Sequence, residues 1–149
     1  MAKTTLHDVP AALVQLVNLI MRNLAPVLAR YRITPQQWSV LAAVANAEED
    51  PSLAAVSRQM MVSKQNMTGM IARLESLGLI RRIEDPTDLR ASMLQLTRKG
   101  KRVIVSAGPV YDAWTEGLLG RLSENDRRAF VRSLDQLTQN LAHELKDER

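Results

Sequence analysis

The sequence predicts a mainly α-helical protein with a small β-wing, in which a winged helix-turn-helix lies between N- and C-terminal helices. Three observations support this class. Apolar residues recur at helical spacing near both ends of the 149-residue chain. Between them, a short helix pattern from Ser63 to Gly78 precedes two strand-like segments that are joined by an acidic turn. Basic residues are concentrated over this same central region.

The first helix is expected from Val9 to Ala29, with Asp8 and Pro10 as start signals and Pro26 kinking or ending it nearby. This stretch is apolar enough to resemble a signal peptide or a membrane span. Its apolar residues nevertheless recur as on an amphipathic helix, and it contains polar residues that a span would exclude, namely Gln15, Asn18, Arg22 and Asn23. We therefore expect a soluble, cytoplasmic protein with no membrane partner.

Capping residues mark the start of the next two helices. Thr34 and Gln37 have the spacing of a capping box, so a helix should begin after Thr34 and run to about Ala47. Ser52 can then cap a short helix that ends near Met60.

The following helix has the pattern expected of a recognition helix. Ser63 can cap it, and Gly78 is a natural left-handed terminator. One face collects apolar side chains, those of Met67, Met70, Ile71, Leu74 and Leu77. The opposite face is small or polar and consists of Gln65, Gly69, Ala72 and Ser76. Because small side chains let a helix axis come close to base edges, this face suits insertion into a DNA groove.

Two strands are expected at residues 79–84 and 91–97, with the polar turn 85–88 between them. Thr97 should then cap a long helix that is interrupted at Gly108-Pro109. A last helix should start at residues 123–126. Its apolar residues form a seam that could fold back within a monomer or pair in a two-fold dimer: Phe130, Leu134, Leu137, Leu141 and Leu145.

The charge distribution favours a nucleic-acid partner. Residues 58–102 hold ten basic and four acidic residues, a net of +6, whereas the rest of the chain holds ten and twelve, which gives the total of +4. A charge run alone is usually a solvated face. Here it coincides with the helix-turn-helix pattern, so Lys64, Arg73, Arg90 and the 98–102 cluster are expected to form a phosphate-binding face.

Several side chains are candidates for specific contacts. The amides of Gln65 and Asn66 suit bidentate recognition of adenine, and Arg90 suits a narrow minor groove. Asp85 and Asp88 are expected to form the turn first, with Asp88 a buttress for the arginine second. Trp38 fits a core aromatic better than a ligand-binding wall.

Other function classes find less support. The chain has only two histidines, no cysteine and no nucleophile elbow, zinc-protease motif or phosphate loop, so we expect no catalysis, no cofactor and no metal. A winged helix that binds protein remains an alternative, although it would not need a small polar outer face, an arginine wing and a basic region in the same segment.

These segments together resemble the MarR (multiple antibiotic resistance regulator) family of transcriptional regulators. The similarity covers nearly the whole chain, and its order and spacing are specific. It includes Thr34-Pro35-Gln36-Gln37-Trp38, Arg73-Leu74-Glu75 with Leu77-Gly78-Leu79-Ile80, Asp85 with Asp88-Leu89-Arg90, and Leu94-Gln95-Leu96-Thr97 with Gly100.

The resemblance implies a single MarR-type domain over residues 1–149. The winged helix-turn-helix lobe would comprise residues 33–100, and the dimerisation helices residues 1–32 and 101–149. It also implies a homodimer that represses a gene from a palindromic double-stranded operator. Family contacts map onto Lys64, Gln65, Asn66, Thr68 and Arg73 of the recognition helix, and onto Asp88 and Arg90 of the wing. Leu89 departs from the second arginine of many relatives, so the wing is expected to bind less tightly.

Many proteins of this family release DNA when a small aromatic or amphipathic compound binds between the dimerisation helices and the lobe. In this chain that crevice would be lined by the first helix, the second helix with Trp38, and the helix after Thr97. A constitutive regulator without an effector is the alternative. Thiol oxidation is not available as a trigger because there is no cysteine.

Overall fold

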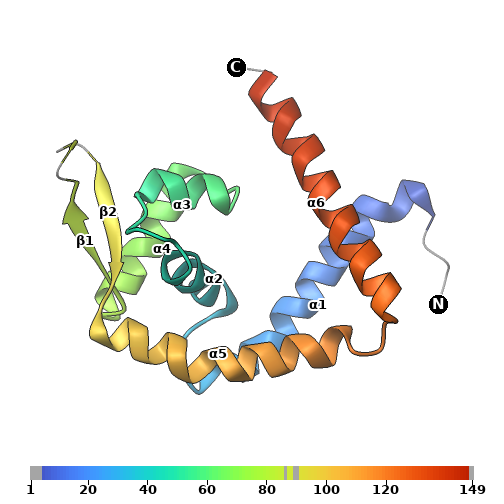
Figure 1. The fold of residues 1–149 in the computed structure, drawn as a ribbon, viewed down its shortest axis with the longest axis horizontal. Helices are drawn as coiled ribbons and strands as arrows, with labels where there is room; N and C mark the ends of the chain where they lie inside the picture. Colours follow the sequence, from blue (N-terminus) through green and yellow to red (C-terminus); the bar gives the residue numbers. More distant parts are fainter. Residues whose placement is uncertain (1–4, 86, 89–90, 148–149) are drawn as a thin grey trace. The chain divides into compact units, whose positions relative to one another are not determined.

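The computed structural model describes residues 5–85, 87–88 and 91–147, with side chains to residue 143. The chain divides into two compact units, Met1–Tyr111 and Asp112–Arg149. Its elements, shown in Figure 1, are a short 3-10 helix Leu6–Asp8, α1 Val9–Ala29, α2 Pro35–Ala45, α3 Leu53–Gln59, α4 Lys64–Ser76, β1 Ile80–Glu84, β2 Ser92–Leu96, α5 Arg98–Leu119 and α6 Glu124–Asp147. The predicted class, mainly helical with a two-stranded wing, is confirmed.

The predicted caps are present at the helix starts of the lobe. The Gln37 amide donates to Thr34 Oγ1 at 3.2 Å, and the Thr34 amide donates to Gln37 Oε1 at 2.9 Å, which completes the capping box of α2. Ser52 Oγ accepts from the Ala55 amide at 3.0 Å, and Ser63 Oγ accepts from the Asn66 amide at 3.2 Å. Local sequence therefore determines where α2, α3 and α4 begin.

The prolines inside α1 and α5 have different effects on their helices. Helix α1 ends at Ala29, soon after Pro26, as expected, but α5 continues through Gly108-Pro109, so the predicted interruption is wrong. Pro109 removes the amide that would bond the Val105 carbonyl. Val105 lies on an exposed side of α5, where water can solvate that carbonyl, and this keeps the loss small enough for the helix to continue.

By length and composition alone, the helical stretch Leu6–Ala29 could cross a membrane, a property shared with signal sequences and with core helices of soluble proteins. Of the residues of α1, only Leu24 and Leu28 are buried. Most of its remaining apolar side chains are exposed to varying degrees, including Val14, Val17 and Leu19.

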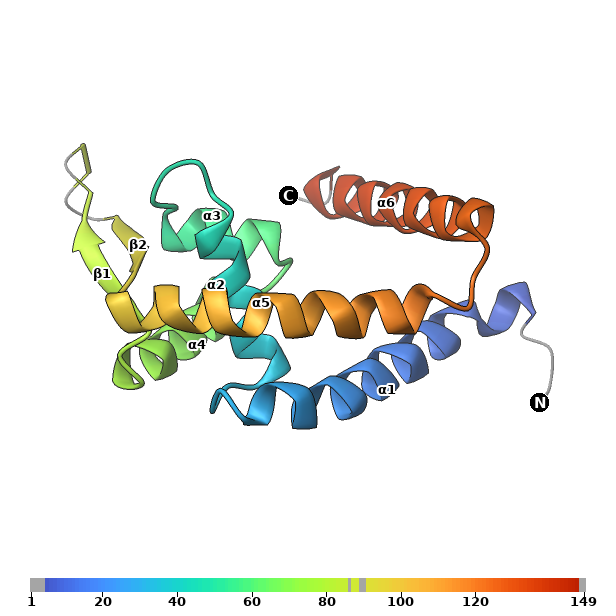
Figure 2. The same ribbon diagram turned by 60° about the horizontal axis from the view of Figure 1, so that its bottom comes forward.

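The wing is an antiparallel pair in which Ile80 faces Leu96 and Glu84 faces Ser92. A hydrogen bond of 2.8 Å from the Leu94 amide to the Pro51 carbonyl, with a bridge between Ser52 and Met93, ties β2 to the residues that precede α3. The wing is therefore held beside α3 and α4 in the first unit (Figures 1 and 2).

The core of this unit is mainly aliphatic, which agrees with an aromatic content of 3%. Helix α4 contributes the fully buried Met67, Ile71 and Leu74, whereas Met70 and Leu77 remain partly exposed. They belong to a core that also contains Leu28, Val40, Leu41, Val56, Ile80 and Leu94. Burial of one face of α4 leaves the opposite face, residues 65, 69, 72 and 76, exposed.

One close backbone approach fixes the start of α5. Gly100 is buried, and a Cβ atom built on it would lie 2.1 Å from the Leu79 carbonyl oxygen. Because a backbone carbonyl cannot rotate away as a side chain can, only glycine fits at this position without displacing the exit of α4.

We predict that Gly100→Ala lowers the free energy of unfolding by about 3 kcal/mol, the upper range for overpacking a well-packed site. Gly69→Ala is the matched control, because a Cβ there meets nothing within 4 Å. It should raise stability by up to about 1 kcal/mol through helix propensity. Chemical denaturation measures both changes, and equal stability of Gly100→Ala and the unaltered protein would contradict the assignment.

Candidate nucleic-acid interface

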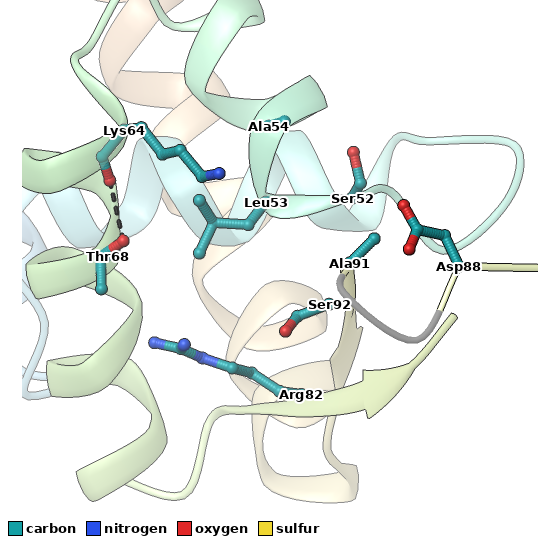
Figure 3. A pocket seen from close by; sticks show the side chains of 9 residues that line it. All are labelled: Ser52, Leu53, Ala54, Lys64, Thr68, Arg82, Asp88, Ala91 and Ser92. Carbon is teal, nitrogen blue, oxygen red and sulfur yellow. Dashed lines mark hydrogen bonds between the residues drawn. The ribbon is translucent and has the colours of Figure 1, made fainter. Parts of the chain in front are cut away.

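Helix α4 presents the predicted contact residues on its exposed side. Lys64, Gln65, Asn66, Thr68 and Arg73 are all exposed, and the first four lie in the first two turns. The Thr68 hydroxyl donates to the Lys64 carbonyl at 2.8 Å (Figure 3), which holds that side chain against the helix. The side-chain amides of Gln65 and Asn66 therefore lie at the N-terminal end of α4, which is the end that would enter a DNA groove.

The middle of this face is low and open. Gly69, Ala72 and Ser76 are exposed, and around Gly69 there is open space within 4 Å of a Cβ position. The Ser76 hydroxyl is turned back onto the Arg73 carbonyl, at 2.7 Å. A long charged residue at these positions would hold a duplex away from the helix axis, so their absence suits close approach to base edges.

A groove of about 430 Å³ lies between the start of α3, the start of α4 and the wing. Figure 3 shows the Lys64 ammonium and the Arg82 guanidinium directed into it from α4 and from β1. The other lining residues are Ser52, Leu53, Ala54, Thr68, Asp88, Ala91 and Ser92. Two cations, two serine hydroxyls and the Asp88 carboxylate give this groove a polar lining.

Arg82 is absent from the specific contacts that the sequence predicts. Its Nε atom pairs with Glu75 Oε2 at 3.1 Å, across from β1 to the last turn of α4. The signal that could have found it is alternation along β1, because Arg81 and Arg82 must point to opposite faces of the strand pair.

Arg81 is held on the other face of the wing. Its Nε donates to Gln95 Oε1 at 2.7 Å, and Gln95 Nε2 donates to Asp50 Oδ2 at 2.8 Å. This chain of side chains joins the wing to the acidic loop before α3 and restricts how far the wing can tilt.

The wing turn is built around Asp85. Its carboxylate accepts from the Thr87 hydroxyl at 2.7 Å and from the Thr87 amide at 2.8 Å. These two hydrogen bonds hold the pKa of Asp85 below its ordinary value, so the turn keeps its carboxylate form. The predicted turn-forming role of Asp85 is confirmed.

The predicted wing contacts are only partly described. Asp88 is exposed at the rim of the groove, where its carbonyl accepts from the Ala91 amide at 2.9 Å. Leu89 and Arg90 lie outside the described residues. The minor-groove role of Arg90 and its support by Asp88 therefore stay predictions.

Trp38 is 6% exposed and packs against Tyr111 of α5, with ring centroids 5.2 Å apart at 40°. The hydroxyl of Tyr31, which follows α1, donates to the Ser106 carbonyl at 3.0 Å and so joins the end of α1 to α5. Trp38 therefore contributes to the core, and a ligand-binding role for it stays a prediction. In the part of the chain that the structure describes, no group of three His, Asp or Glu residues could hold a metal ion.

Comparison with known proteins agrees with this geometry. A family model described as "MarR family" matches residues 33–91. The transcriptional regulator HosA of Escherichia coli is 32% identical over 99 residues, which cover 66% of this chain and 73% of HosA. The transcriptional activatory protein BadR of Rhodopseudomonas palustris is 32% identical over 117 residues, covering 76% of this chain and 67% of BadR.

Solved structures show the same fold at lower identity. A MarR protein from Peptoclostridium difficile matches with a TM-score of 0.87 and 16% identity, covering 100% of this chain and 97% of that one. MepR of S. aureus, in the crystal structure of its complex with DNA, matches with a TM-score of 0.79 and 18% identity, covering 92% of this chain and 99% of that one.

We predict that the exposed amides and the exposed lysine of α4 have separable effects on DNA binding. Gln65→Ala or Asn66→Ala should narrow the affinity gap between a preferred duplex and a shuffled one, because each lost bidentate contact costs about 1–3 kcal/mol of discrimination. Lys64→Ala should weaken both duplexes alike. Fluorescence-anisotropy titrations measure this, and full sequence preference in both amide variants would place recognition elsewhere.

Proposed function

The chain belongs to the MarR family of transcriptional regulators, and from this premise we propose that it represses a gene by covering a palindromic operator as a homodimer. A small aromatic or amphipathic ligand would then relieve repression. The family consists of DNA-binding transcriptional regulators and not of enzymes. The sign of regulation, the dimer and the ligand are the parts that we propose.

One observation supports a DNA-binding surface on α4. Helix α4 buries Met67, Ile71 and Leu74 completely and leaves a small, polar face exposed on the opposite side. Exposed cations flank this face, and the groove with Arg82 adjoins it. The small side chains in the middle of this face, at Gly69, Ala72 and Ser76, are unusual on a solvent-exposed helix. They would instead allow the helix to lie in a major groove.

The proposed contacts follow from the chemistry of each side chain. Lys64 and Arg73 would bind phosphates, whereas Gln65, Asn66 and Thr68 would contact base edges. Arg90 would enter the minor groove beside the wing, with Asp88 aligning its guanidinium. The positive region also predicts steep loss of affinity as salt rises, since each neutralised phosphate releases counterions.

Exposed apolar residues on both terminal helices support the homodimer. In the first unit, the 3-10 helix exposes Leu6, and α1 exposes Val14 and Val17. In the second unit, α6 exposes a stripe with helical spacing, in which Val131 is 51% and Leu141 is 61% exposed, together with Leu134 and Leu137. The side chain of Leu145 lies outside the described residues. Such stripes are unfavourable in water and mark a surface for association.

A second copy of the chain would cover these stripes and set the separation of the two lobes, with residues 1–32 and 101–149 as the dimerisation helices. In this arrangement α1 is a packing helix and not a membrane span, which fits a cytoplasmic regulator. Two lobes are also what a palindromic site requires, because each lobe contacts one half-site.

The ligand would act on the junction of α1, α2 and α5. Trp38 on α2 packs against the tilted ring of Tyr111 of α5, and Tyr31 after α1 is hydrogen-bonded to α5. An aromatic anion that enters among these rings would shift α5 against the lobe. It could release DNA only if it binds more tightly to a lobe separation that does not fit the operator.

Two alternatives give different results in the same experiments. A constitutive regulator would bind its operator with no response to small molecules. A winged helix that binds protein would show neither sequence preference nor the salt dependence of a phosphate-binding face. BadR is named a transcriptional activatory protein. Deleting the gene for this chain and measuring transcription of its target gene therefore decides whether this chain represses or activates.

We predict that one or more benzoate-like or phenolic anions weaken operator binding, while peroxide at levels that oxidise sensor cysteines leaves it intact, because the chain contains no cysteine. Operator titrations with and without each compound measure the effect, and tryptophan fluorescence reports binding at Trp38. Trp114→Phe removes the second tryptophan as a confounding signal. If no compound changes fluorescence or affinity, the constitutive alternative holds.

A further inference from the structure

The C-terminal end of the recognition helix α4 is capped both by the residues that follow it and by residues at the start of α5. Gly78 has a φ of 69°, and the Leu79 amide donates to the Leu74 carbonyl at 2.9 Å while the Gly78 amide donates to the Glu75 carbonyl at 2.8 Å. This is a Schellman motif, which satisfies two of the last carbonyls of the helix. The carbonyls of Leu77 and Gly78, which follow, need other donors.

Those donors are Thr97, which immediately precedes α5, and Lys99 in its first turn. The Thr97 hydroxyl donates to the Gly78 carbonyl at 2.6 Å, and the Thr97 amide donates to the Leu79 carbonyl at 3.0 Å. The Lys99 ammonium donates to the Leu77 carbonyl at 2.7 Å. Three successive carbonyls at the end of α4 are therefore bound by two residues at the start of α5, which Gly100 allows to pack this closely.

We propose that Lys99 is a positioning residue for the recognition helix, which supports sequence discrimination by holding the last turn of α4 and not by binding a phosphate. The inference rests on the proposed function, in which α4 contacts the bases. It also assigns Lys99 a role different from that of its neighbours in the 98–102 basic cluster.

The position of the ammonium supports this role on electrostatic grounds. The C-terminal end of a helix carries partial negative charge on its unpaired carbonyls, so a cation is favourable there. A charged donor also makes a stronger hydrogen bond than a neutral one. The bond to the Leu77 carbonyl uses one of the three N–H donors of the ammonium and directs this group toward the end of α4.

The turn that Lys99 holds is connected to two cations of the candidate interface. The Arg73 carbonyl accepts from the Leu77 amide at 3.1 Å, so the backbone of Arg73 belongs to the same turn. Glu75, also in this turn, forms the 3.1 Å ion pair with Arg82 of β1. If the turn loosens, the backbone of Arg73 and the ion pair that holds Arg82 are both disturbed.

Three variants separate positioning from charge. Lys99→Met keeps the aliphatic stem and removes the donor. Lys99→Arg keeps both charge and donor, so it should rescue the loss. Lys101→Met removes the same charge from an exposed lysine two residues further along α5 and measures the effect of charge alone.

Each variant is compared with the unaltered dimer in two measurements. Amide hydrogen exchange of the DNA-free protein should be about threefold to tenfold faster at Leu77, Gly78 and Leu79 in Lys99→Met, as expected for local opening of the turn. Binding is then titrated over a range of salt concentrations with a duplex selected from a random pool and with its shuffled counterpart. Lys99→Met should bind the selected duplex about fivefold more weakly and the shuffled duplex unchanged, with the same salt slope.

The opposite results are equally clear. A salt slope reduced by about 0.9 in Lys99→Met, with equal weakening on both duplexes, would mean that Lys99 binds a phosphate directly and would overturn the proposal. Unchanged exchange at residues 77–79 would also overturn it. If the unaltered protein prefers no sequence, the proposed function fails instead, and the exchange measurement distinguishes this case because it uses no DNA.

Discussion

The burial of one face of α4 is the constraint on which the rest of the structure depends. Met67, Ile71 and Leu74 are fully buried, which fixes the rotation of the helix about its axis. That rotation alone decides that Gln65, Gly69 and Ala72 face solvent. Any change that rotates the helix by one residue would turn its surface by about 100° and carry the small polar face away from its present direction.

The contacts around α4 serve to keep this rotation and the helix position fixed. Ser63 closes its first turn, Thr97 and Lys99 bind its last carbonyls, and Glu75 connects it to the wing through Arg82. The wing in turn is joined to the residues before α3 by backbone and side-chain hydrogen bonds. The first unit therefore presents its helix and wing as one surface, which is what simultaneous contact with two grooves demands.

Much of this fold could be predicted because its signals are local. Caps such as Thr34 with Gln37, and the left-handed Gly78, act within four residues of the helix ends that they define. The continuation of α5 through Pro109 could not be predicted, because it depends on whether solvent or a partner can compensate for one lost hydrogen bond. Local rules alone carry no information on that balance.

The candidate site divides in the same way. The exposed face of α4 follows from helical periodicity, whereas Arg82 and Lys99 acquire their roles from partners that lie seven and 22 residues away in sequence. The sequence predicts phosphate contacts for Lys64, Arg73, Arg90 and the 98–102 cluster. The partners of Arg81, Arg82 and Lys99 within the protein, which are Gln95, Glu75 and the Leu77 carbonyl, could not be predicted from basic composition.

We propose that a dimer of this chain presents two α4 faces to one DNA duplex. Hydroxyl-radical footprinting on the DNA that flanks its gene, with the stoichiometry measured by sedimentation, tests this proposal most directly. We expect protection of two inverted half-sites whose centres lie about 10 base pairs apart or at a multiple of that distance, with one dimer bound. Protection of a single half-site by a monomer, or uniform protection without sequence preference, would contradict it.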